Sequence, residues 1–380
     1  MMDMAGGKSR LTWAVNLFAA LLVLLWIIPT VGLLISSFRD RDAISTSGWW
    51  TALSASEKNV IERALAPDQA KPEGDLWVLE GHVLEGQGVT VTAFGITSKE
   101  PVAFTPGDTA THARGHKITV RADGRYRIEY AEEPSESRGQ RLFVRAETPP
   151  GFTLDNYREV LFAEGMGRSL LNTLTVTIPA TIIPVLVAAF AAYALAWMEM
   201  PGRALLVAAV VGLLVVPLQV AFIPLLKLHI GIGLGKGYLG IWLAHTGFGL
   251  PLAVFLLRNY MVGLPGEIIE SARVDGATDF QIFRRIILPL SFPALASFAI
   301  FQFLWVWNDL LVAKVFLGTG EDQVVMTGRI VDLLGSRGGD WEILAASAFV
   351  SIAVPILVFF SLQRYLVRGV LAGSVKGAAV

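Results

Sequence analysis

The sequence has no cysteine and little charge for its length. None of its 380 residues is a cysteine, and 17% are Asp, Glu, Lys or Arg, whereas soluble domains carry about 25%. The absence of cysteine excludes disulfide bonds, a thiolate nucleophile and a cysteine-ligated zinc site. The formal net charge of −1 gives no indication of a nucleic-acid partner.

The charges that are present are unevenly spread. The segment between Phe38 and Arg168 holds 15 of the 31 basic residues and 20 of the 32 acidic ones. The rest of the chain contains long uncharged runs, and the mean hydropathy of the whole chain is +0.56. A soluble enzyme or a disordered chain has no means of keeping such runs out of water, so both classes are excluded.

Six uncharged stretches are long enough to cross a bilayer. A hydrocarbon core of about 30 Å needs about 20 apolar helical residues, because unpaired backbone groups cannot face lipid. The sequence therefore predicts an all-α, polytopic membrane protein with six transmembrane helices, at Leu11–Phe38, Ser169–Met198, Ala204–Leu226, Gly237–Leu257, Ile286–Asn308 and Ile343–Gln363.

Basic residues in the short loops orient these helices. With a cytoplasmic N-terminus, the inner segments carry ten: Lys8, Arg10, Arg203, Arg258, Arg273, Arg284, Arg285, Arg364, Arg368 and Lys376. The short outer segments carry five: Lys227, Lys236, Lys314, Arg329 and Arg337. We therefore expect a multi-pass protein of the cell membrane with both termini in the cytoplasm.

This orientation divides the chain into four parts. We expect the N-terminus and first helix at 1–38, an extracytoplasmic inserted domain at 39–165, a five-helix core at 166–366 and a cytoplasmic tail at 367–380. The inserted domain is predicted to be mostly β, because Lys117–Arg121 and Arg125–Tyr130 alternate around Asp123-Gly124, a strong hairpin signal. Further strands are predicted at Leu76–Leu84, Val89–Phe94 and Arg141–Ala146.

Two further expectations concern the start of the inserted domain and its role. Ser54 and Glu57 have the spacing of a capping box, which predicts a short helix through Leu65. The domain as a whole fits a solubilising role with no chemistry of its own better than a dedicated ligand pocket.

The cytoplasmic stretch before the fifth span predicts a helical hairpin. Residues Glu267–Val274 form the first helix, which ends at Gly276, because glycine accepts the left-handed conformation. Thr278 and Gln281 form a capping box for the second helix, and Pro289 is expected to stop it. An apolar stripe follows that second helix at Phe280, Phe283, Ile286 and Ile287. Such a hairpin fits either a groove on another protein or a connector lying on lipid headgroups.

This stretch resembles the EAA loop of ABC-transporter permeases. The loop is written E-A-A, three residues, G, nine residues, I-x-L-P, and this chain matches it at Glu270, Ala272, Gly276, Ile286, Leu288 and Pro289. Ser271 replaces the central alanine of the pattern by another small residue. The run Arg-Val-Asp-Gly-Ala at 273–277 is similar to the corresponding stretch of the binding-protein-dependent sugar permeases.

The resemblance extends along the membrane part. Trp307-Asn308-Asp309 is similar to the family's Trp-Asn-acid motif in the fifth span, and residues 363–377 resemble the C-terminus of the shorter maltose-transporter permease. Glu199 departs from the basic residue that relatives usually have after the second span. Residues 40–150 are absent from most such permeases, and a long insertion there resembles the α-glucoside permease branch.

The resemblance implies the type I fold of ABC-importer permeases and a set of partners. The chain would form half of a transmembrane pair, with two ATP-binding cassette subunits below and an extracytoplasmic solute-binding protein above. It would bind no cofactor, and ATP and Mg²⁺ would belong to the ATPase subunits. The loop at 259–289 would contact an ATPase subunit through Glu270, Ser271, Ala272, Asp275, Gly276, Ala277, Phe280, Leu288 and Pro289. The C-terminal tail would contact it through Gln363, Arg364, Tyr365, Gly373 and Lys376.

The end of the fifth span supplies candidates for the solute path. They are Asn308, Asp309, Trp305 and Trp307, because intramembrane polar groups usually face the bundle interior and tryptophan rings can stack on sugars. The same residues also fit a helix-packing hydrogen bond and an interfacial tryptophan belt. Both interpretations remain open at this point.

Other motifs indicate neither catalysis nor a metal. The glycine-rich stretch Gly231–Gly237 has glycine where a phosphate-binding loop needs Ser or Thr, so we interpret it as a turn. The five histidines show no metal spacing, and no Ser/His/Asp or paired-carboxylate arrangement is present. The chain is therefore expected not to be an enzyme.

Taken together, these features predict a permease subunit of an ATP-driven importer for an oligosaccharide, such as the α-glucosides maltose, trehalose or sucrose. The alternative, an ion-coupled secondary sugar transporter, expects ionisable residues buried within the spans, whereas the six stretches are uncharged. A receptor whose β domain senses a ligand would leave the cytoplasmic hairpin unexplained.

Overall fold

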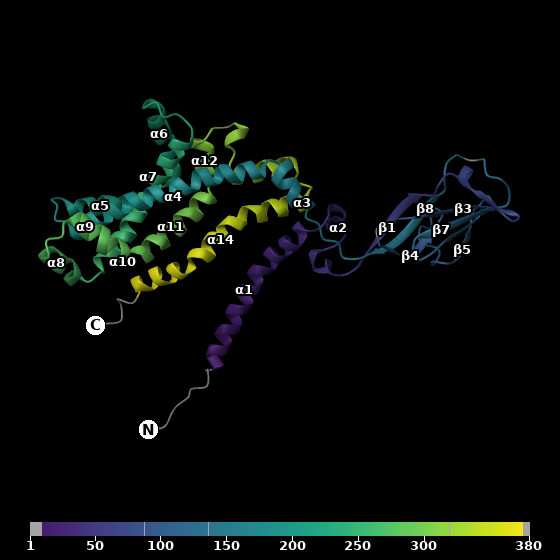
Figure 1. Cartoon of the computed structure of the whole chain (residues 1–380), viewed down its shortest axis with the longest axis horizontal. Coiled ribbons are helices and arrows are strands. Elements are labelled where there is room, and N and C mark those ends of the chain that lie inside the picture. The colour runs from purple at the N-terminus through teal and green to yellow at the C-terminus, as the bar shows by residue number, and fades with distance from the viewer. Residues whose placement is uncertain (1–9, 87, 136, 319, 375–380) are drawn as a thin grey trace, which may run out of the picture. The chain divides into compact units, whose positions relative to one another are not determined.

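The computed structural model describes residues 10–374, apart from 87, 136 and 319, as two compact units. The first unit ends at Asn156 and contains a long apolar helix and a β-rich part. The second begins at Tyr157 and is helical (Figure 1). Each unit is described by itself.

The first unit begins with two helices and continues into strands. The helices are α1 (Arg10–Ser37) and α2 (Arg41–Thr46), with 3-10 turns at Trp49–Thr51 and Pro67–Gln69. The strands are β1 (Ser56–Arg63), β2 (Lys71–Glu73), β3 (Leu76–His82), β4 (Thr90–Gly95), β5 (Thr109–Thr111), β6 (Lys117–Val120), β7 (Arg125–Tyr130) and β8 (Arg141–Thr148).

These strands form two antiparallel sheets that share one core. One sheet has the order β1-β8-β4 and the other β2-β3-β7-β6-β5, and side chains of both sheets, such as Phe94 and Ile118, are completely buried in the same cluster. The hairpin predicted around Asp123-Gly124 is confirmed, since β6 pairs with β7 and Gly124 has a φ of 87°. The strands predicted near residues 76–84, 89–94 and 141–146 are present as β3, β4 and β8.

The predicted helix from Ser54 to Leu65 is wrong. This stretch is strand β1, which pairs antiparallel with β8 from Ser56 opposite Thr148 to Arg63 opposite Arg141. Exposure alternates along β1, with Val60 half-buried and Ile61 exposed, as expected for a strand with one face on the core. The ladder to β8 provides backbone hydrogen bonds along the strand, and this pairing outweighs a local capping signal.

The second unit is a bundle of helices that follows α3 (Asp155–Arg158) at the junction. Its helices are α4 (Met166–Trp197), α5 (Arg203–Leu213), α6 (Leu218–Gly231), α7 (Tyr238–Val262), α8 (Gly266–Val274), α9 (Asp279–Ile282), α10 (Leu288–Leu290), α11 (Phe292–Trp307), α12 (Leu311–Phe316), α13 (Met326–Ser336) and α14 (Trp341–Ser374). Single π-helical turns lie at Glu159–Ala163 and Phe283–Ile287, and a 3-10 turn lies at Glu321–Gln323.

Four helices in the described part of the chain are long and apolar enough to cross a membrane by themselves, namely α1, α4, α7 and α14. Two bent pairs also qualify: α5 with α6, bent by 106°, and the segment Asp279–Leu290 with α11, bent by 70°. Residues 10–374, as far as they are described, therefore contain four such helices, or up to six spans if each bent pair crosses once.

Neither of the third and fifth predicted spans is one continuous helix. The third breaks between α5 and α6, where Pro217 precedes α6, because proline disfavours helical backbone in the residue before it. Within the fifth predicted span, the continuous helix α11 begins at Phe292, after a bend at Ser291. The second hairpin helix continues through the π turn and α10 as one segment, Asp279–Leu290, so it ends one residue after Pro289 and bends there into α11.

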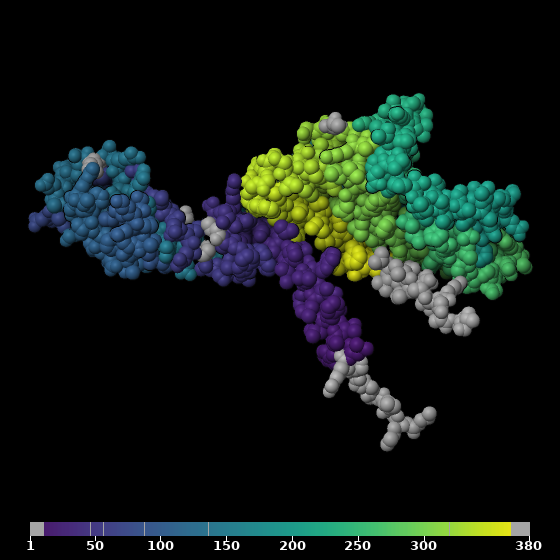
Figure 2. Space-filling view, turned by 180° about the vertical axis from the view of Figure 1, so that it is seen from behind, coloured from purple at the N-terminus to yellow at the C-terminus, as the bar shows by residue number. Residues whose placement is uncertain are grey.

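Small residues fill the contact between α4 and α7 in the second unit, and large apolar residues lie on the outer side of α4. Between α4 and α7, Ala188, Ala192 and Ala253 are completely buried, which lets the two helices approach closely. On the same helix α4, Phe190 is 52% exposed and Leu186 is also exposed. Figure 2 shows α6 standing out from the surface of this unit.

Candidate functional site

The predicted cytoplasmic hairpin is present as α8 and α9, at one end of the helical unit (Figure 1). The amide of Ala277 donates to the carbonyl of Ala272, and the amide of Gly276 to that of Arg273. These two bonds form a Schellman motif, and Gly276 has the φ of 80° that such a motif requires. The predicted capping box of Thr278 and Gln281 is confirmed in both of its hydrogen bonds.

Hydrogen bonds attach the hairpin to the ends of two long helices. The Tyr193 hydroxyl of α4 donates to Oδ1 of Asp279 at 3.2 Å. Arg273 reaches the same carboxylate at 3.4 Å and donates to the carbonyl of Trp197 at 3.0 Å. The indole of Trp197 in turn donates to the carbonyl of Met261 on α7 at 3.1 Å. The hairpin is thus bonded directly to α4 and, through Trp197, is linked to α7.

The inner side of the hairpin is packed like the core of a soluble protein. Ile269, Ile282 and Ile287 are almost completely buried in one cluster with the C-terminal ends of α4 and α7. Phe283 lies against two rings of α4, with centroid distances of 4.6 Å to Phe190 and 5.3 Å to Tyr193. Close packing of this kind makes the hairpin a rigid element.

The outer side of the hairpin exposes most of the residues predicted to contact an ATPase subunit. The exposed ones are Glu270, Ser271, Asp275, Gly276, Phe280 and Pro289. Phe280, predicted to belong to the apolar stripe of the second helix, is 60% exposed, and Val274 beside the turn is 87% exposed. The remaining three, Ala272, Ala277 and Leu288, are partly buried against the inner cluster. Exposed apolar side chains around an exposed, rigid turn form a surface suited to a protein groove.

The candidates for a solute path differ in their surroundings. Trp307 is buried, stacks on Phe303 at 5.5 Å and donates to the carbonyl of Ser351 on α14 at 2.9 Å. Asp309 accepts from the amide of Val312 at 2.7 Å and thereby caps α12. These two residues therefore have packing and capping roles in this conformation.

Two of the path candidates have more open surroundings. Trp305 is half-buried, with its ring 6.4 Å from that of His245. Asn308 is exposed, and its amide donates to the carbonyl of Leu304 in its own helix. Trp305 and Asn308 are therefore the candidates that a solute could reach with the least rearrangement.

The bundle interior also contains polar side chains that the sequence analysis did not single out. Gln302 of α11 is completely buried and donates to the carbonyl of Ala180 on α4 at 3.1 Å. His245 of α7 and Thr177 of α4 are also buried. A Cβ at Gly249 would lie 2.7 Å from the side-chain oxygen of Gln302, so a larger residue there would displace the Gln302 amide. Gln302 and His245 could have been noticed in the sequence, because an amide and an imidazole within uncharged spans usually mark functional positions.

The C-terminal helix reaches back toward the bend before α11. The ring of Tyr365 meets that of Phe292 edge-on at 5.1 Å, and its carbonyl accepts from the Ser297 hydroxyl at 3.1 Å. The guanidinium of Arg364 lies 4.7 Å from the centre of the Tyr365 ring, and Gln363 is exposed. Gly373 lies at the end of α14, while Lys376 is outside the described residues.

Comparison with known proteins gives consistent results. Residues 168–372 match the family described as binding-protein-dependent transport system inner membrane component. The chain is 65% identical to the alpha-glucoside transport system permease protein AglG of Rhizobium meliloti, over 97% of this chain and 98% of that protein. It is 35% identical to the trehalose transport system permease protein SugB of Mycobacterium tuberculosis, over 60% of this chain and 84% of that one.

A solved bacterial ABC transporter involved in the import of the acidic polysaccharide alginate is also similar. That match has 24% identity and a TM-score of 0.49, and covers 58% of this chain and 81% of the other. The family match alone covers more than half of the chain, and the alignment with AglG also includes the β-rich part. The chain therefore belongs to the family of inner membrane components of binding-protein-dependent transport systems.

Proposed function

We propose that this chain is the transmembrane permease subunit of an ATP-driven importer for an α-glucoside oligosaccharide such as maltose, trehalose or sucrose. The observation that carries the proposal is the 65% identity with AglG, which is named an alpha-glucoside transport system permease protein, over nearly the full length of both chains. The resemblance of the cytoplasmic hairpin to the EAA loop supports the same conclusion from within this sequence.

The topology is part of the proposal. Each bent pair crosses the membrane once, which gives six spans in the type I permease arrangement with both termini in the cytoplasm. The β-rich part between α1 and α4 then lies outside the cytoplasm. The excess of basic residues in the hairpin and the other inner loops supports this orientation.

The hairpin would couple this subunit to ATP hydrolysis. Two ATP-binding cassette subunits would bind ATP and Mg²⁺, and the exposed turn around Gly276, with Phe280 beside it, would sit in a cleft of one of them. Closure of the ATPase pair would push the hairpin, and the bonds from Asp279 to Tyr193 and from Trp197 to Met261 would carry the movement into α4 and α7. A rigid hairpin is required, because a loosely attached one would absorb the movement.

The remaining partners would lie beside and above this chain. A second permease subunit would complete the transport path, and an extracytoplasmic solute-binding protein would deliver the sugar. Within this chain, Trp305 and Asn308 are the proposed path residues, because one is half-buried and the other exposed. Trp307 and Asp309 would act by fixing the helices around that path.

Uptake by the reconstituted transporter tests the proposal. Proteoliposomes containing this chain, its second permease, the ATPase subunits and the binding protein should take up radiolabelled maltose, trehalose or sucrose only with ATP inside. A transporter without the binding protein is the control and should show little uptake. Uptake without ATP that follows an imposed proton or sodium gradient would contradict the proposal and favour an ion-coupled transporter.

A further inference from the structure

The segments that join α1 to the sandwich carry exposed apolar side chains. Residues 43–56 contain no charged residue, and within them Trp50 is 73% exposed and Leu53 is 79% exposed. On the segment that returns from β8, Phe152 and Leu154 are exposed as well. Single exposed apolar residues are ordinary on a protein surface, so the surroundings of these four determine their role.

Both segments are attached to the C-terminal end of α1. A Cβ added at Gly32 would lie 2.7 Å from the indole nitrogen of Trp49, so the Trp49 ring lies against the backbone of α1. The amide of Thr153, in the middle of the second segment, donates to the carbonyl of Phe38 at 2.7 Å. The exposed apolar residues are therefore held near the last turns of an apolar helix that is long enough to cross a membrane.

Further hydrogen bonds fix this arrangement. The side-chain amide of Asn156 donates to the carbonyl of Ser37 at 2.9 Å and to that of Arg39 at 2.8 Å. Arg39 is buried, and its guanidinium donates to the carbonyl of Ala43 at 2.8 Å and to that of Ser47 at 3.2 Å. Because these bonds satisfy the buried charge within the segment, the chain after α1 has a defined fold that brings the next 3-10 turn back to α1.

The contact at Gly32 lies at the depth of a membrane interface. Helix α1 has 28 residues, whereas about 20 helical residues cross the hydrocarbon core. A centred α1 therefore extends beyond the core by about four residues at each end. Gly32 is the sixth residue from the C-terminal end of α1, so Trp49 lies near the boundary between acyl chains and headgroups. Tryptophan is enriched at this boundary, because it combines an apolar ring with a polar N–H.

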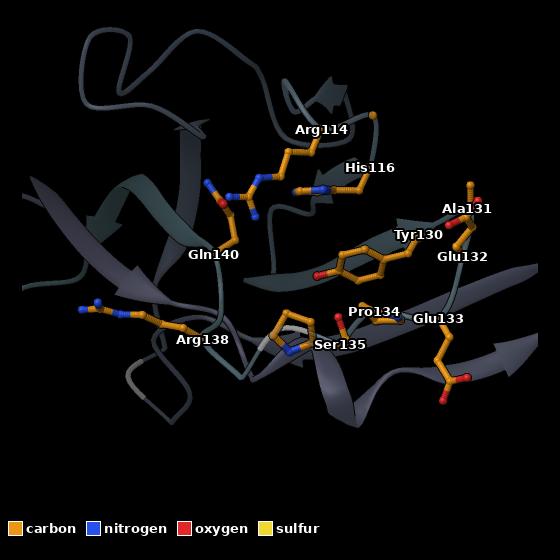
Figure 3. A pocket seen from close by; sticks show the side chains of 12 residues that line it. Arg114, His116, Tyr130, Ala131, Glu132, Glu133, Pro134, Ser135, Arg138 and Gln140 are labelled. Atoms are coloured by element: carbon orange, nitrogen blue, oxygen red, sulfur yellow. The ribbon is translucent and has the colours of Figure 1, made fainter.

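The loops of the sandwich have a different surface. Figure 3 shows a pocket between the β5–β6 turn and the β7–β8 segment, and the residues that line it include Arg114, Glu132, Glu133 and Arg138. Charged side chains of this kind belong in water, because their transfer into lipid is costly. The uncharged segment at 43–56 lacks this barrier, so it can enter the lipid interface.

We propose that Trp50, Leu53, Phe152 and Leu154 lie in the lipid interface at the C-terminal end of α1 and anchor the chain where it leaves the membrane. The bilayer is the partner, because the two segments are attached to a helix that itself crosses it. The proposal goes beyond the transport function. Only the naming of this interface as the extracytoplasmic one rests on the proposed topology.

Spin labels on single cysteines test the depth of these residues. The chain has no cysteine, so each introduced cysteine is the only labelling site. Labels at Leu53→Cys and Leu154→Cys are compared in the full-length chain in vesicles of phosphatidylethanolamine and phosphatidylglycerol. Their accessibility to oxygen, which concentrates in lipid, divided by that to a water-soluble nickel chelate should exceed the ratio at Ile61→Cys by about threefold or more. Ile61 is 63% exposed on the sandwich, and Leu25→Cys, near the middle of α1, should give a still higher ratio.

Two results would overturn the proposal directly. A ratio equal to that at Ile61→Cys would show that the segments lie in water, and low accessibility to both reagents would show that protein covers them. These depth readings need neither sugar nor ATPase subunits and are the same for either side of the membrane. Their failure would therefore leave the proposed importer and its topology intact.

A second variant tests the anchor itself. Trp50→Ser in the Leu53→Cys chain should raise nickel accessibility at position 53 by about twofold, because it removes the interfacial ring. Trp341→Ser is the matched control, since Trp341 is an exposed tryptophan of the second unit, and it should leave the reading at position 53 unchanged. Unchanged nickel accessibility with Trp50→Ser would also contradict the anchor.

Discussion

The two units of the chain differ in how many large apolar side chains they leave on their surface. In the β sandwich, Phe94, Ile118 and Leu142 are inside and completely buried. In the helical unit, alanines fill the contact between α4 and α7, while Phe190 and Leu186 face outward. The sandwich is therefore stabilised by removing apolar surface from water, whereas the bundle is stabilised by close backbone approach with its apolar surface left for lipid.

The hairpin formed by α8 and α9 combines features of both units. It is attached to the bundle, yet its inner face carries buried isoleucines, and its outer face carries charged and polar residues together with the exposed Val274 and Phe280. Such a pattern belongs to a segment that lies in water and packs against the end of the bundle. This arrangement leaves the turn around Gly276 accessible to another protein.

The largest effect is expected in the core of the sandwich. Ile118→Ala leaves a cavity at a completely buried position and should destabilise the β-rich part by about 2–5 kcal/mol. Hydrogen exchange of the full-length chain in detergent should show lost protection in β6 and β7. Ile61→Ala, at a position 63% exposed, should change protection little. Equal effects of the two substitutions would contradict the assignment of inside and outside faces.

A somewhat smaller effect is expected where α4 meets α7. Ala188→Leu adds three carbons to a completely buried site and should destabilise the bundle by about 1–3 kcal/mol. Leu186→Ala, on the exposed side of the same helix, should change stability by less than about 0.5 kcal/mol. Thermal unfolding in detergent measures both. A more stable Ala188→Leu protein would show that the small residues are not needed for close approach.

The attachment of the hairpin should respond to loss of a single hydroxyl group. Tyr193→Phe removes the bond to Asp279 and should lower the protection of α8 and α9 by about 1 kcal/mol, or about fivefold in exchange rate. Tyr365→Phe is the control, because it keeps the ring contact with Phe292. Unchanged exchange in the Tyr193 variant would mean that apolar packing alone holds the hairpin.

A small pH effect is expected from Tyr126 in the sandwich. Burial raises the pKa of Tyr126 above its ordinary value of 10.0, so the folded state holds the phenolic proton more tightly than the unfolded state. The resulting stabilisation is fully present below about pH 10 and is lost as the pH rises through the folded pKa. Thermal unfolding followed by near-ultraviolet circular dichroism at about pH 8 and pH 11 should therefore differ less in Tyr126→Phe than in the unchanged chain. An identical pH difference in both proteins would contradict this contribution.

The sequence predicted elements whose signals are local. The capping box at Thr278, the glycine turn at Gly276 and the Asp123-Gly124 hairpin each depend on a few neighbouring residues, and the structure confirms all three. Strand β1 was predicted wrongly, because its identity comes from pairing with β8. In that pairing Lys58 lies opposite Ala146, 88 residues further along the chain.

The bends and the buried polar residues were also beyond local signals. Hydropathy reports that a stretch is apolar but not that its helix turns by 106° between α5 and α6. In the sequence, Gln302 and His245 stand out only as polar residues within uncharged spans, and the structure shows that both are buried. Phe280 and Gly276 are exposed in the structure, and the contacts proposed for them are with another protein.

The central claim is that the exposed turn at Gly276 transmits force to an ATPase subunit, and two matched glycines test it. Gly276 and Gly202 have φ of 80° and 77°, and no described neighbour lies within 4 Å of a Cβ added at either. Gly276→Val and Gly202→Val should therefore cost this chain a similar amount, roughly 1–2 kcal/mol of backbone strain. They differ in that Gly276 belongs to the hairpin and Gly202 precedes α5.

The deciding measurement is maltose uptake together with ATP hydrolysis in proteoliposomes that contain each variant and all the partner subunits. We predict that Gly276→Val inserts normally but loses uptake by more than about tenfold and is no longer stimulated by the loaded binding protein, while Gly202→Val stays near normal. Glu270→Ala should fall between them, because it removes one exposed charge and leaves the turn intact. Normal coupled uptake with Gly276→Val, or an equal loss in both glycine variants, would contradict the account.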